Sequence, residues 1–349
     1  MRLRVIAIGC TLTGALGFVA LPPVAALADT GVIAASTASK STLTLDAPAT
    51  VVYGANVVLS GRLTFATGTP PAQTPVTITR TGGGAAAKTF TVNTAAKGSF
   101  TLTDDSPAKG RYTYTAVFAG TAKAAASKAT ATVTVETVKP QMSVSAPATN
   151  YPYGDKVKLT VTLGPTFSDR AVSLYASPYG EGRTLVATGD VNAQGKWYPT
   201  YSITRKTLFT AVFAGDAHND PNSARLTLQA YARVTDRITG DFKTTKIGGV
   251  SYDEFHSSGT LTLYSTVAPA KHGECLEPET EQAEVGTTWG ADTKYGCDSL
   301  TEESHDTAPF TVNLAVGDRY RIRGDYVRAA KDLGNLSEQG PWLYFEVVK

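Results

Sequence analysis

The feature that most constrains this chain is an internal repeat. The hexapeptide Thr-Ala-Val-Phe-Ala-Gly occupies positions 115–120 and recurs letter for letter at 210–215, and a Tyr-Gly pair at 53–54 recurs at 153–154. The copies are therefore 95 to 100 residues apart. A repeat of this length is too long for a solenoid unit, and it matches the ~100 residues of a β-sandwich domain.

Apolar and polar residues alternate in both copies. In the first copy, the apolar positions of two such stretches are Val57, Leu59 and Leu63, and then Tyr112, Tyr114, Ala116 and Phe118. The second copy has the same pattern over 157–163 and 209–213. A period of two with Val, Leu and aromatic residues is typical of half-buried strands. No stretch has the spacing of an amphipathic helix, so we expect an all-β chain.

Both copies resemble the bacterial Ig-like repeat domains of actinobacterial secreted and surface proteins. The resemblance rests on the Tyr-Gly pair, on an Asn-x-x-Gly-x-aromatic turn near Asn93 and Asn192, and on the hexapeptide strand. The first copy departs from the pattern at Thr121, where the second has Asp216. The resemblance covers 41–137 and 140–233, and it implies tandem Ig-like Greek-key β-sandwiches without enzymatic activity. We expect the linker 136–140 to act as a hinge.

The segment 238–349 does not repeat, but Tyr320, Ile322 and Tyr326 follow a glycine in the same strand pattern as the copies. We therefore predict a third, divergent β-sandwich there. Its middle, 269–307, is acidic and rich in turn residues. Cys275 and Cys297 are the two cysteines of the predicted mature chain, and an even number of cysteines in an exported protein predicts a disulfide bond. This bond would stabilise the fold by roughly 3 kcal/mol.

The N-terminus has the pattern of a signal peptide. Arg2 and Arg4 precede an apolar stretch that ends at a small-residue cleavage site, Ala26-Leu27-Ala28. We predict a signal peptide over 1–28, a disordered Ala/Ser/Thr-rich leader over 29–40, and a secreted, extracellular mature chain, with association with the cell surface as the alternative to release. No later stretch is long and apolar enough to predict a membrane span in the mature chain.

Charge is divided between the two parts of the mature chain. Residues 29–240 carry 20 Lys/Arg and 12 Asp/Glu, a net of +8, and residues 241–349 carry 10 and 18, a net of −8. The basic residues are not clustered as they are in nucleic-acid-binding proteins, so we expect no nucleic acid partner. The difference is consistent with drift in composition between domains, although oppositely charged parts can also attract each other or two partners.

The candidate ligand-binding residues of the acidic segment are Glu277, Glu279 and Glu281. A solvated acidic loop explains this run, and binding of a cation or a basic partner is the functional alternative. An enzyme would need two carboxylates ~5–9 Å apart in a cleft, as glycosidases have. The residues that could supply them in 269–307 are Glu274, Glu277, Asp292 and Asp298. The sequence has no nucleophile elbow, zinc motif or cofactor motif, so we expect no catalytic residue, metal or cofactor.

The other candidate residues are Tyr175 and Tyr179, which flank a proline near a predicted turn. Exposed aromatic rings can stack on sugars, whereas buried rings fill a core. The oxygen-rich segment 216–222 lacks the glycine and the closing glutamate of a calcium loop, so we interpret it as a polar turn.

These observations favour a secreted, non-enzymatic binding, adhesion or spacer module. Its partner would be an extracellular protein or glycan that the sequence does not identify. The alternatives are a polysaccharide-binding module that uses turn aromatics and, third, an enzyme with its site in 269–307.

Overall fold

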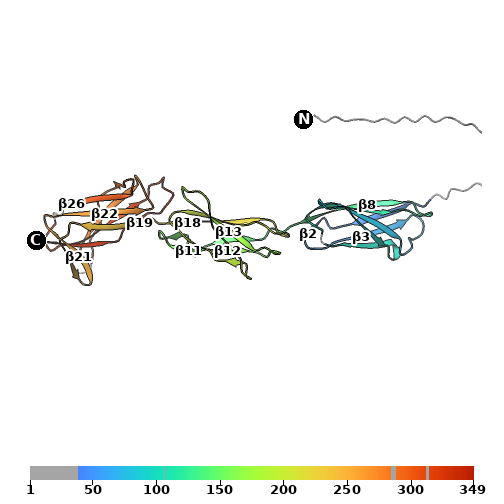
Figure 1. Ribbon diagram of the computed structural model, residues 1–349, viewed down its shortest axis with the longest axis horizontal. Coiled ribbons are helices and arrows are strands. Elements are labelled where there is room, and N and C mark those ends of the chain that lie inside the picture. The colour runs from blue at the N-terminus through green and yellow to red at the C-terminus, as the bar shows by residue number, and fades with distance from the viewer. Residues whose placement is uncertain (1–37, 106, 284–287, 312–313) are drawn as a thin grey trace, which may run out of the picture.

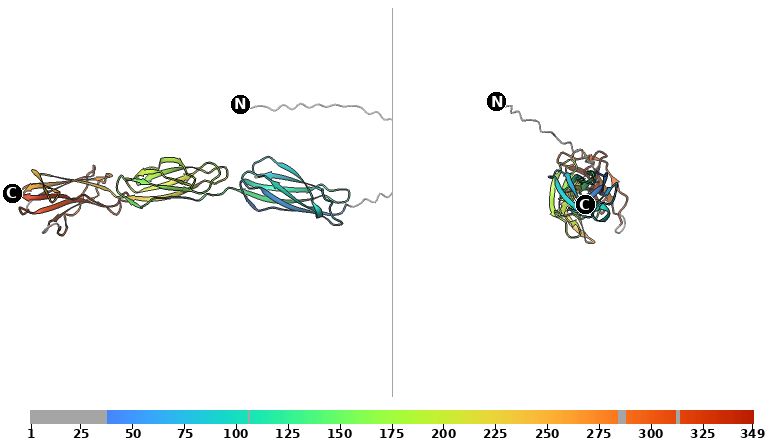
Figure 2. Two further views of the ribbon diagram at one scale, coloured as in Figure 1. Left: turned by 90° about the horizontal axis from the view of Figure 1, so that it is seen from below. Right: turned by 90° about the vertical axis from the view of Figure 1, so that its right-hand side faces the viewer.

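The computed structural model describes residues 38–105, 107–283, 288–311 and 314–349. The described residues form strands, turns and one short 3-10 turn, η1 (Ala96–Gly98). Three β-sandwiches follow one another along a single long axis (Figures 1 and 2). The signal peptide predicted at 1–28, and the leader 29–40 up to residue 37, lie outside the described residues. No described helix is long and apolar enough to cross a membrane.

The first sandwich consists of a three-stranded and a five-stranded sheet that enclose one apolar core. The three-stranded sheet has the order β1 (Ser41–Asp46), β3 (Val57–Phe65) and β6 (Ser99–Asp104). The five-stranded sheet has the order β2 (Thr50–Val52), β8 (Ser127–Glu136), β7 (Gly110–Phe118), β4 (Pro75–Gly82) and β5 (Lys88–Asn93). The chain crosses from one sheet to the other after β1, β2, β3, β5 and β6, as in a Greek-key β-sandwich.

The second sandwich repeats this topology. Its five-stranded sheet has the order β10 (Asn150–Tyr151), β18 (Asn222–Ala230), β17 (Thr207–Phe213), β13 (Ala171–Pro178) and β14 (Thr184–Asp190). The facing strands are β9 (Met142–Ser145), β12 (Thr160–Leu163) and β15 (Lys196–Trp197), together with the pair β11 (Lys156–Lys158) and β16 (Thr200–Ser202). The repeated hexapeptide lies at the ends of β7 and β17, which occupy the same place in the two sheets.

The third sandwich has a larger second sheet. Its three-stranded sheet has the order β19 (Arg233–Thr239), β22 (Thr260–Ala268) and β26 (His305–Thr311). The other sheet has the order β20 (Lys243–Ile247), β21 (Val250–His256), β29 (Leu343–Val348), β27 (Arg319–Val327), β23 (Cys275–Gln282) and β24 (Thr293–Lys294). Two short strands extend it, β25 (Asp298–Ser299) beside β23 and β28 (Glu338–Gln339) beside β27. The tandem all-β sandwich fold expected from the repeat is confirmed.

The first strand of the third sandwich starts before residue 238, the start predicted for that domain. β19 begins at Arg233 and pairs with β22, so 233–237 precede the predicted start. Only Tyr231 and Ala232 separate β18 from β19, so no turn or change in composition marks the boundary. The disulfide bond predicted between Cys275 and Cys297 is present, and it attaches the segment before β25 to β23.

In each sandwich, the segment that leads into the first strand forms the same kind of backbone bridge with a loop of that sandwich. Val138, between the first and second sandwiches, forms an isolated parallel bridge with Asn219 in the loop before β18. Tyr231, between the second and third, forms one with Leu336 in the loop between β27 and β29. Ser39 forms a third such bridge with Ala124 in the loop before β8. The linker 136–140, where we expect a hinge, is therefore hydrogen bonded to the second sandwich, which it enters.

Side chains also connect the first and second sandwiches, at the contact between the linker 136–140 and the loop 216–222 that we call the first joint. The His218 ring lies between two aromatic rings, with its centroid 4.2 Å from that of Tyr53 in the first sandwich and 3.5 Å from that of Phe167 in the second. Asp220 accepts hydrogen bonds from Lys109 at 2.8 Å and from Thr137 at 2.5 Å. The polar turn predicted at 216–222 therefore contacts the first sandwich through the side chains of His218 and Asp220.

Asp216 shapes that turn from within. Its carboxylate accepts hydrogen bonds from the amides of His218 and Asn219, both at 2.8 Å, and from the amide of Phe167 at 3.0 Å. Burial opposes ionisation of this carboxyl, but these hydrogen bonds and one from the Asn219 side chain outweigh it and lower its pKa. The carboxylate oxygens are thus used as a turn cap.

Buried hydrogen bonds connect the second and third sandwiches, at the contact of 204–206 and 230–232 with 334–336 that we call the second joint. The Asn335 side chain, in the third sandwich, donates to the carbonyl oxygens of Thr204, Tyr231 and Ala230 at 2.9, 3.1 and 3.4 Å. The Lys206 amide donates in the opposite direction, to the carbonyl of Gly334 at 2.6 Å. Asn335 is only 1% exposed, so these hydrogen bonds are buried in the interface between the two sandwiches.

Candidate functional site

The outer face of the large sheet in the third sandwich gathers most of the candidate residues. Because successive side chains of a strand alternate, Tyr320 and Ile322 of β27 point into the core. Arg319, Arg321 and Arg323 therefore lie together on the opposite face of the sheet. The alternation of arginine with apolar residues over 319–323 is the sequence signal for this face.

The acidic run lies on the same face. Glu277, Glu279 and Glu281 are alternate residues of β23, and in the register of the sheet they stand opposite Asp325, Arg323 and Arg321. Glu279 is 1% exposed and Glu281 is 7% exposed. The expectation of a solvated acidic loop is therefore wrong for these residues. Glu279 and Glu281 each face an arginine of β27 with which they can pair, whereas Glu277 faces Asp325 and pairs with Lys294 of β24 instead.

Ion pairs join the two strands. Arg321 donates to Glu281 from Nε at 2.9 Å and also from Nη2, and Arg323 Nη2 lies 3.2 Å from both carboxylate oxygens of Glu279. Lys294 of β24 donates to Glu277 at 2.8 Å. Buried ion pairs of this kind offset much of their desolvation cost only when the geometry is good, as it is for a guanidinium on a carboxylate.

Indole rings cover the arginines. The Arg321 guanidinium lies 4.7 Å from the ring centroid of Trp289 and 4.2 Å from that of Trp342, and Arg323 lies 4.0 Å from the same Trp342 ring. Cation–π contacts at these distances contribute about 0.5–2 kcal/mol each, more when they are desolvated. The face is therefore rigid, with aromatic rings and charged groups in alternation.

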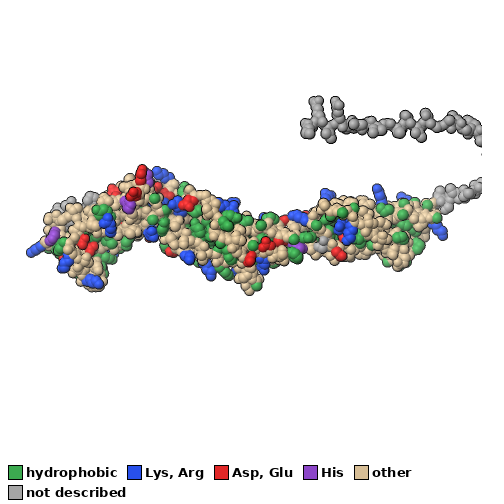
Figure 3. Space-filling view, in the orientation of Figure 1, with side chains coloured by type: hydrophobic (Ala, Val, Ile, Leu, Met, Phe, Trp, Pro, Cys, Tyr) green, Lys and Arg blue, Asp and Glu red, His purple; other side chains and the backbone are tan. Residues whose placement is uncertain are grey.

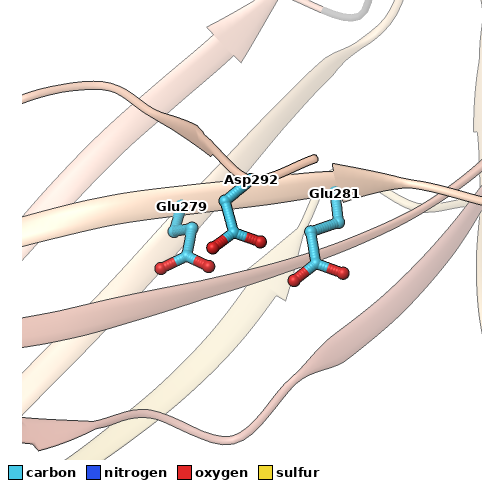
Figure 4. Close-up of side chains that lie close together, drawn as sticks. All are labelled: Glu279, Glu281 and Asp292. Atoms are coloured by element: carbon cyan, nitrogen blue, oxygen red, sulfur yellow. The ribbon is translucent and has the colours of Figure 1, made fainter. Parts of the chain in front are cut away.

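Three carboxylates converge at the edge of this face. Glu279 and Glu281 project from β23, and Asp292 reaches between them from the neighbouring segment, so that one oxygen of each lies within 4.8 Å of the others (Figure 4). Burial raises the pKa of Glu279, and so does the nearby Asp325; burial and the adjacent Asp292 raise the pKa of Glu281 in the same way. Two of the three carboxylates, those of Glu281 and Glu279, also bind an arginine each.

Two of the four residues proposed for an enzyme site bind partners of their own. Glu274 accepts a hydrogen bond from the Ala329 amide at 3.1 Å, and Glu277 binds Lys294. A cleft of about 820 Å³ opens beside the β23–β24 edge, and its described lining includes Thr280, Gln282, Tyr295 and Tyr320. None of Glu274, Glu277, Asp292 and Asp298 is among the described residues that line this cleft. The geometry thus gives the enzyme hypothesis no pair of carboxylates in a cleft.

Tyr175 and Tyr179 lie in the second sandwich, away from the acidic run. Tyr175 points outward from β13, and the Arg183 guanidinium lies 3.8 Å from its ring centroid. Tyr179 is 43% exposed, and it lies beside the second joint, where a Cβ atom built on Gly334 would be 3.3 Å from its ring. One ring therefore bears a guanidinium and the other borders the third sandwich. Sugar stacking by this pair stays a prediction.

No protein-family model matches the chain, and no curated protein matches it either. Two solved structures are among those that match this chain. A tetra-tandem repeat from the extending region of a large adhesion protein is 16% identical, covers 88% of this chain and 74% of its own, and has a TM-score of 0.36. A putative membrane-anchored protein from Corynebacterium diphtheriae is 12% identical, covers 88% of this chain and 91% of its own, and has a TM-score of 0.29. Both TM-scores are below 0.5, so neither similarity bears on what this chain does.

Proposed function

We propose that the chain is a secreted, non-enzymatic Ig-like repeat protein in which the first two sandwiches form a stiff arm that carries the third. The signal peptide predicted at 1–28 and the disulfide bond between Cys275 and Cys297 support an extracellular location, because disulfide bonds persist in oxidising compartments. The two copies at 41–137 and 140–233 support membership of the bacterial Ig-like repeat domains. The third sandwich would contact an extracellular protein or glycan.

The recurring bridge at the entrance to each sandwich carries this proposal. A linker of two to five residues with free dihedral angles would let neighbouring sandwiches pivot, since flexible connections between domains are the default. Here each linker contributes both an amide and a carbonyl to the sandwich that it enters. Val138 donates to His218 at 3.1 Å and accepts from Asp220 at 2.8 Å. Around Leu336, two bonds of 2.9 and 3.0 Å join Ala230 and Ala232 to the third sandwich.

The surface fits an arm better than a binding platform along its whole length. On the face shown in Figure 3, Lys and Arg side chains are scattered over all three sandwiches. The aromatic and charged residues that pack together are instead concentrated on the large sheet of the third sandwich, around Arg321 and Trp342. A specific contact would therefore be made at that end.

Small-angle X-ray scattering of the mature chain tests the arm. Each sandwich has a strand of nine residues, which is roughly 30 Å of strand, so three sandwiches and their loops form a rod of about 120 Å. Such a rod has a radius of gyration of about 35 Å, against about 20 Å for a compact globule of this length.

The matched control carries four glycine and serine residues inserted after Val138. We expect the insertion to broaden the distribution of interatomic distances, because it separates the bridge with Asn219 from the rest of the linker. A wild-type radius of gyration near that of a globule would contradict the arm. So would a wild-type distance distribution as broad as that of the insertion variant.

A further inference from the structure

The first arginine of the outer face lacks the close partner that the other two have. Arg321 and Arg323 each hydrogen bond to a glutamate of β23. The Nε of Arg319, in contrast, lies 3.7 Å from the nearest oxygen of Glu346, which is too far for a hydrogen bond. This Nε is buried and has no hydrogen-bond partner in the described part of the chain. A buried donor without a partner costs about 1–3 kcal/mol, so the arrangement needs an explanation.

Arg319 lines a pocket of about 200 Å³ with aromatic walls. Tyr252 of β21, Tyr344 of β29 and Trp289 are three of its walls. The Tyr344 ring centroid lies 5.6 Å from that of Tyr252 and 5.6 Å from that of Trp289, with interplanar angles of 62° and 53°. The three rings therefore bend around the opening instead of stacking flat against one another.

The strand register builds this pocket on rigid elements. β21 and β29 pair in parallel with Asp253 opposite Phe345, which places the preceding residue of each strand, Tyr252 and Tyr344, side by side on the outer face. Trp289 is held by the bridge between its own backbone and that of Ala283. A pocket on paired strands is largely pre-formed, as binding sites for small ligands usually are.

The size and charge of the pocket indicate the class of ligand. Its volume is below the ~300 Å³ at which pockets for drug-sized ligands begin, so it fits a single ring-sized unit. Arg319 and Glu346 are opposite charges on facing residues, and Glu254 beside them has Lys243 at 3.4 Å. The surroundings are therefore close to neutral, and the pocket attracts neither a free anion nor a free cation strongly.

We infer that this pocket binds a neutral hexopyranose unit of a glycan. The aromatic walls pack against the C–H faces of the sugar ring, and its hydroxyl groups can accept hydrogen bonds from the guanidinium of Arg319, which lines the pocket. An apolar side chain of a peptide would fill the same volume but would leave the buried Nε of Arg319 without a hydrogen-bond partner. This inference goes beyond the stiff arm, because the pocket can bind whether or not the joints are rigid.

Calorimetric titration of the mature chain with methyl glycosides tests the inference. The probes are the methyl glycosides of glucose, galactose, mannose and N-acetylglucosamine, each raised to about 50 mM so that a millimolar dissociation constant is saturated. We expect saturable binding of at least one of them. Trp289→Ala removes one wall without touching a strand, and Arg319→Lys keeps the charge but loses the planar fork of donors. Each should weaken binding at least tenfold.

Tyr198→Ala is the matched control, since Tyr198 is also an exposed ring beside a cation, Lys158, but lies in the second sandwich. It should bind the glycoside as the wild type does. Unchanged thermal unfolding of the Trp289→Ala variant separates loss of the wall from loss of the fold. Absence of saturable binding to all four probes would overturn the inference. Equal binding by Trp289→Ala and wild type, or tighter binding of methyl glucuronide than of methyl glucoside, would also overturn it.

Discussion

Replacement of Asn335 by alanine should open the second joint and leave the sandwiches intact. The side chain donates two N–H groups to three carbonyls of the second sandwich and its linker, those of Thr204, Tyr231 and Ala230. Each buried hydrogen bond is worth about 1 kcal/mol net, and the carbonyls left behind lose a partner that water cannot easily replace. The total is about 2–3 kcal/mol. If this free energy holds the joint closed, the open fraction should rise about 30- to 150-fold.

Native-state hydrogen exchange measures that opening. The amides of Lys206 and Ala232 are bonded across the joint, to the carbonyls of Gly334 and Leu336, so they exchange when the joint opens. In Asn335→Ala these two amides should exchange faster by the stated factor, while amides inside the sheets of both sandwiches keep their wild-type rates.

Asn222→Ala is the comparison, because Asn222 donates to the carbonyl of Pro140 at 2.7 Å and so belongs to the first joint. It should leave the amides of Lys206 and Ala232 unchanged. The reasoning is refuted if those two amides keep their wild-type rates in Asn335→Ala. It is also refuted if amides throughout the second and third sandwiches accelerate by the same factor, since that would show global unfolding instead of a local opening.

Three further substitutions test individual contacts, each followed by hydrogen exchange or thermal unfolding of the sandwich concerned. Burial raises the pKa of Asp236 in the folded protein. The protonated carboxyl therefore stabilises the third sandwich below the unfolded pKa of about 4, and this stabilisation is lost as the pH rises through the folded pKa. Asp236→Asn should remove this dependence of the unfolding free energy on pH. Asp104→Ala leaves the Arg80 guanidinium, 2.6 Å away in the wild type, without its buried partner, and should destabilise the first sandwich by about 3–5 kcal/mol, whereas a loss below 1 kcal/mol would contradict the buried pair. Replacing Cys275 and Cys297 by alanine opens a loop with a sequence separation of 22 residues and should cost the third sandwich about 3 kcal/mol, with the other two unaffected.

The strands of the first two sandwiches could be predicted because the signal for them is local. The alternation in 110–118 and 207–213 determines which side chains face the core, and the hexapeptide places both segments at the same point of the repeat. The start of the third sandwich could not be predicted in this way. Only two residues separate β18 from β19, and both strands alternate, so the change of sheet leaves no mark in the sequence.

The candidate site was predictable only in part, for a different reason. The acidic residues of 277–281 were visible, but their partners depend on the register that sets Glu279 opposite Arg323, 44 positions later in the chain. The pocket beside Arg319 depends on another long-range pairing, between β21 and β29. A single sequence shows which residues alternate within a strand, whereas it does not show which strand becomes the neighbour.

The two copies share a fold but differ in the loops that make joints, and this difference follows from chemistry. Thr121 and Asp216 both follow the repeated hexapeptide, and both cap their loop by accepting amide hydrogen bonds, Thr121 from Lys123 and Ala124 at 3.2 and 3.1 Å. A hydroxyl is sufficient to hold a loop that ends in alanines. The loop of the second copy also presents His218 to the preceding sandwich, and a carboxylate with more acceptor sites fixes it more firmly. The position at which the two copies differ therefore lies in the loop that pairs with Ser39 in the first copy and that holds His218 against the first sandwich in the second.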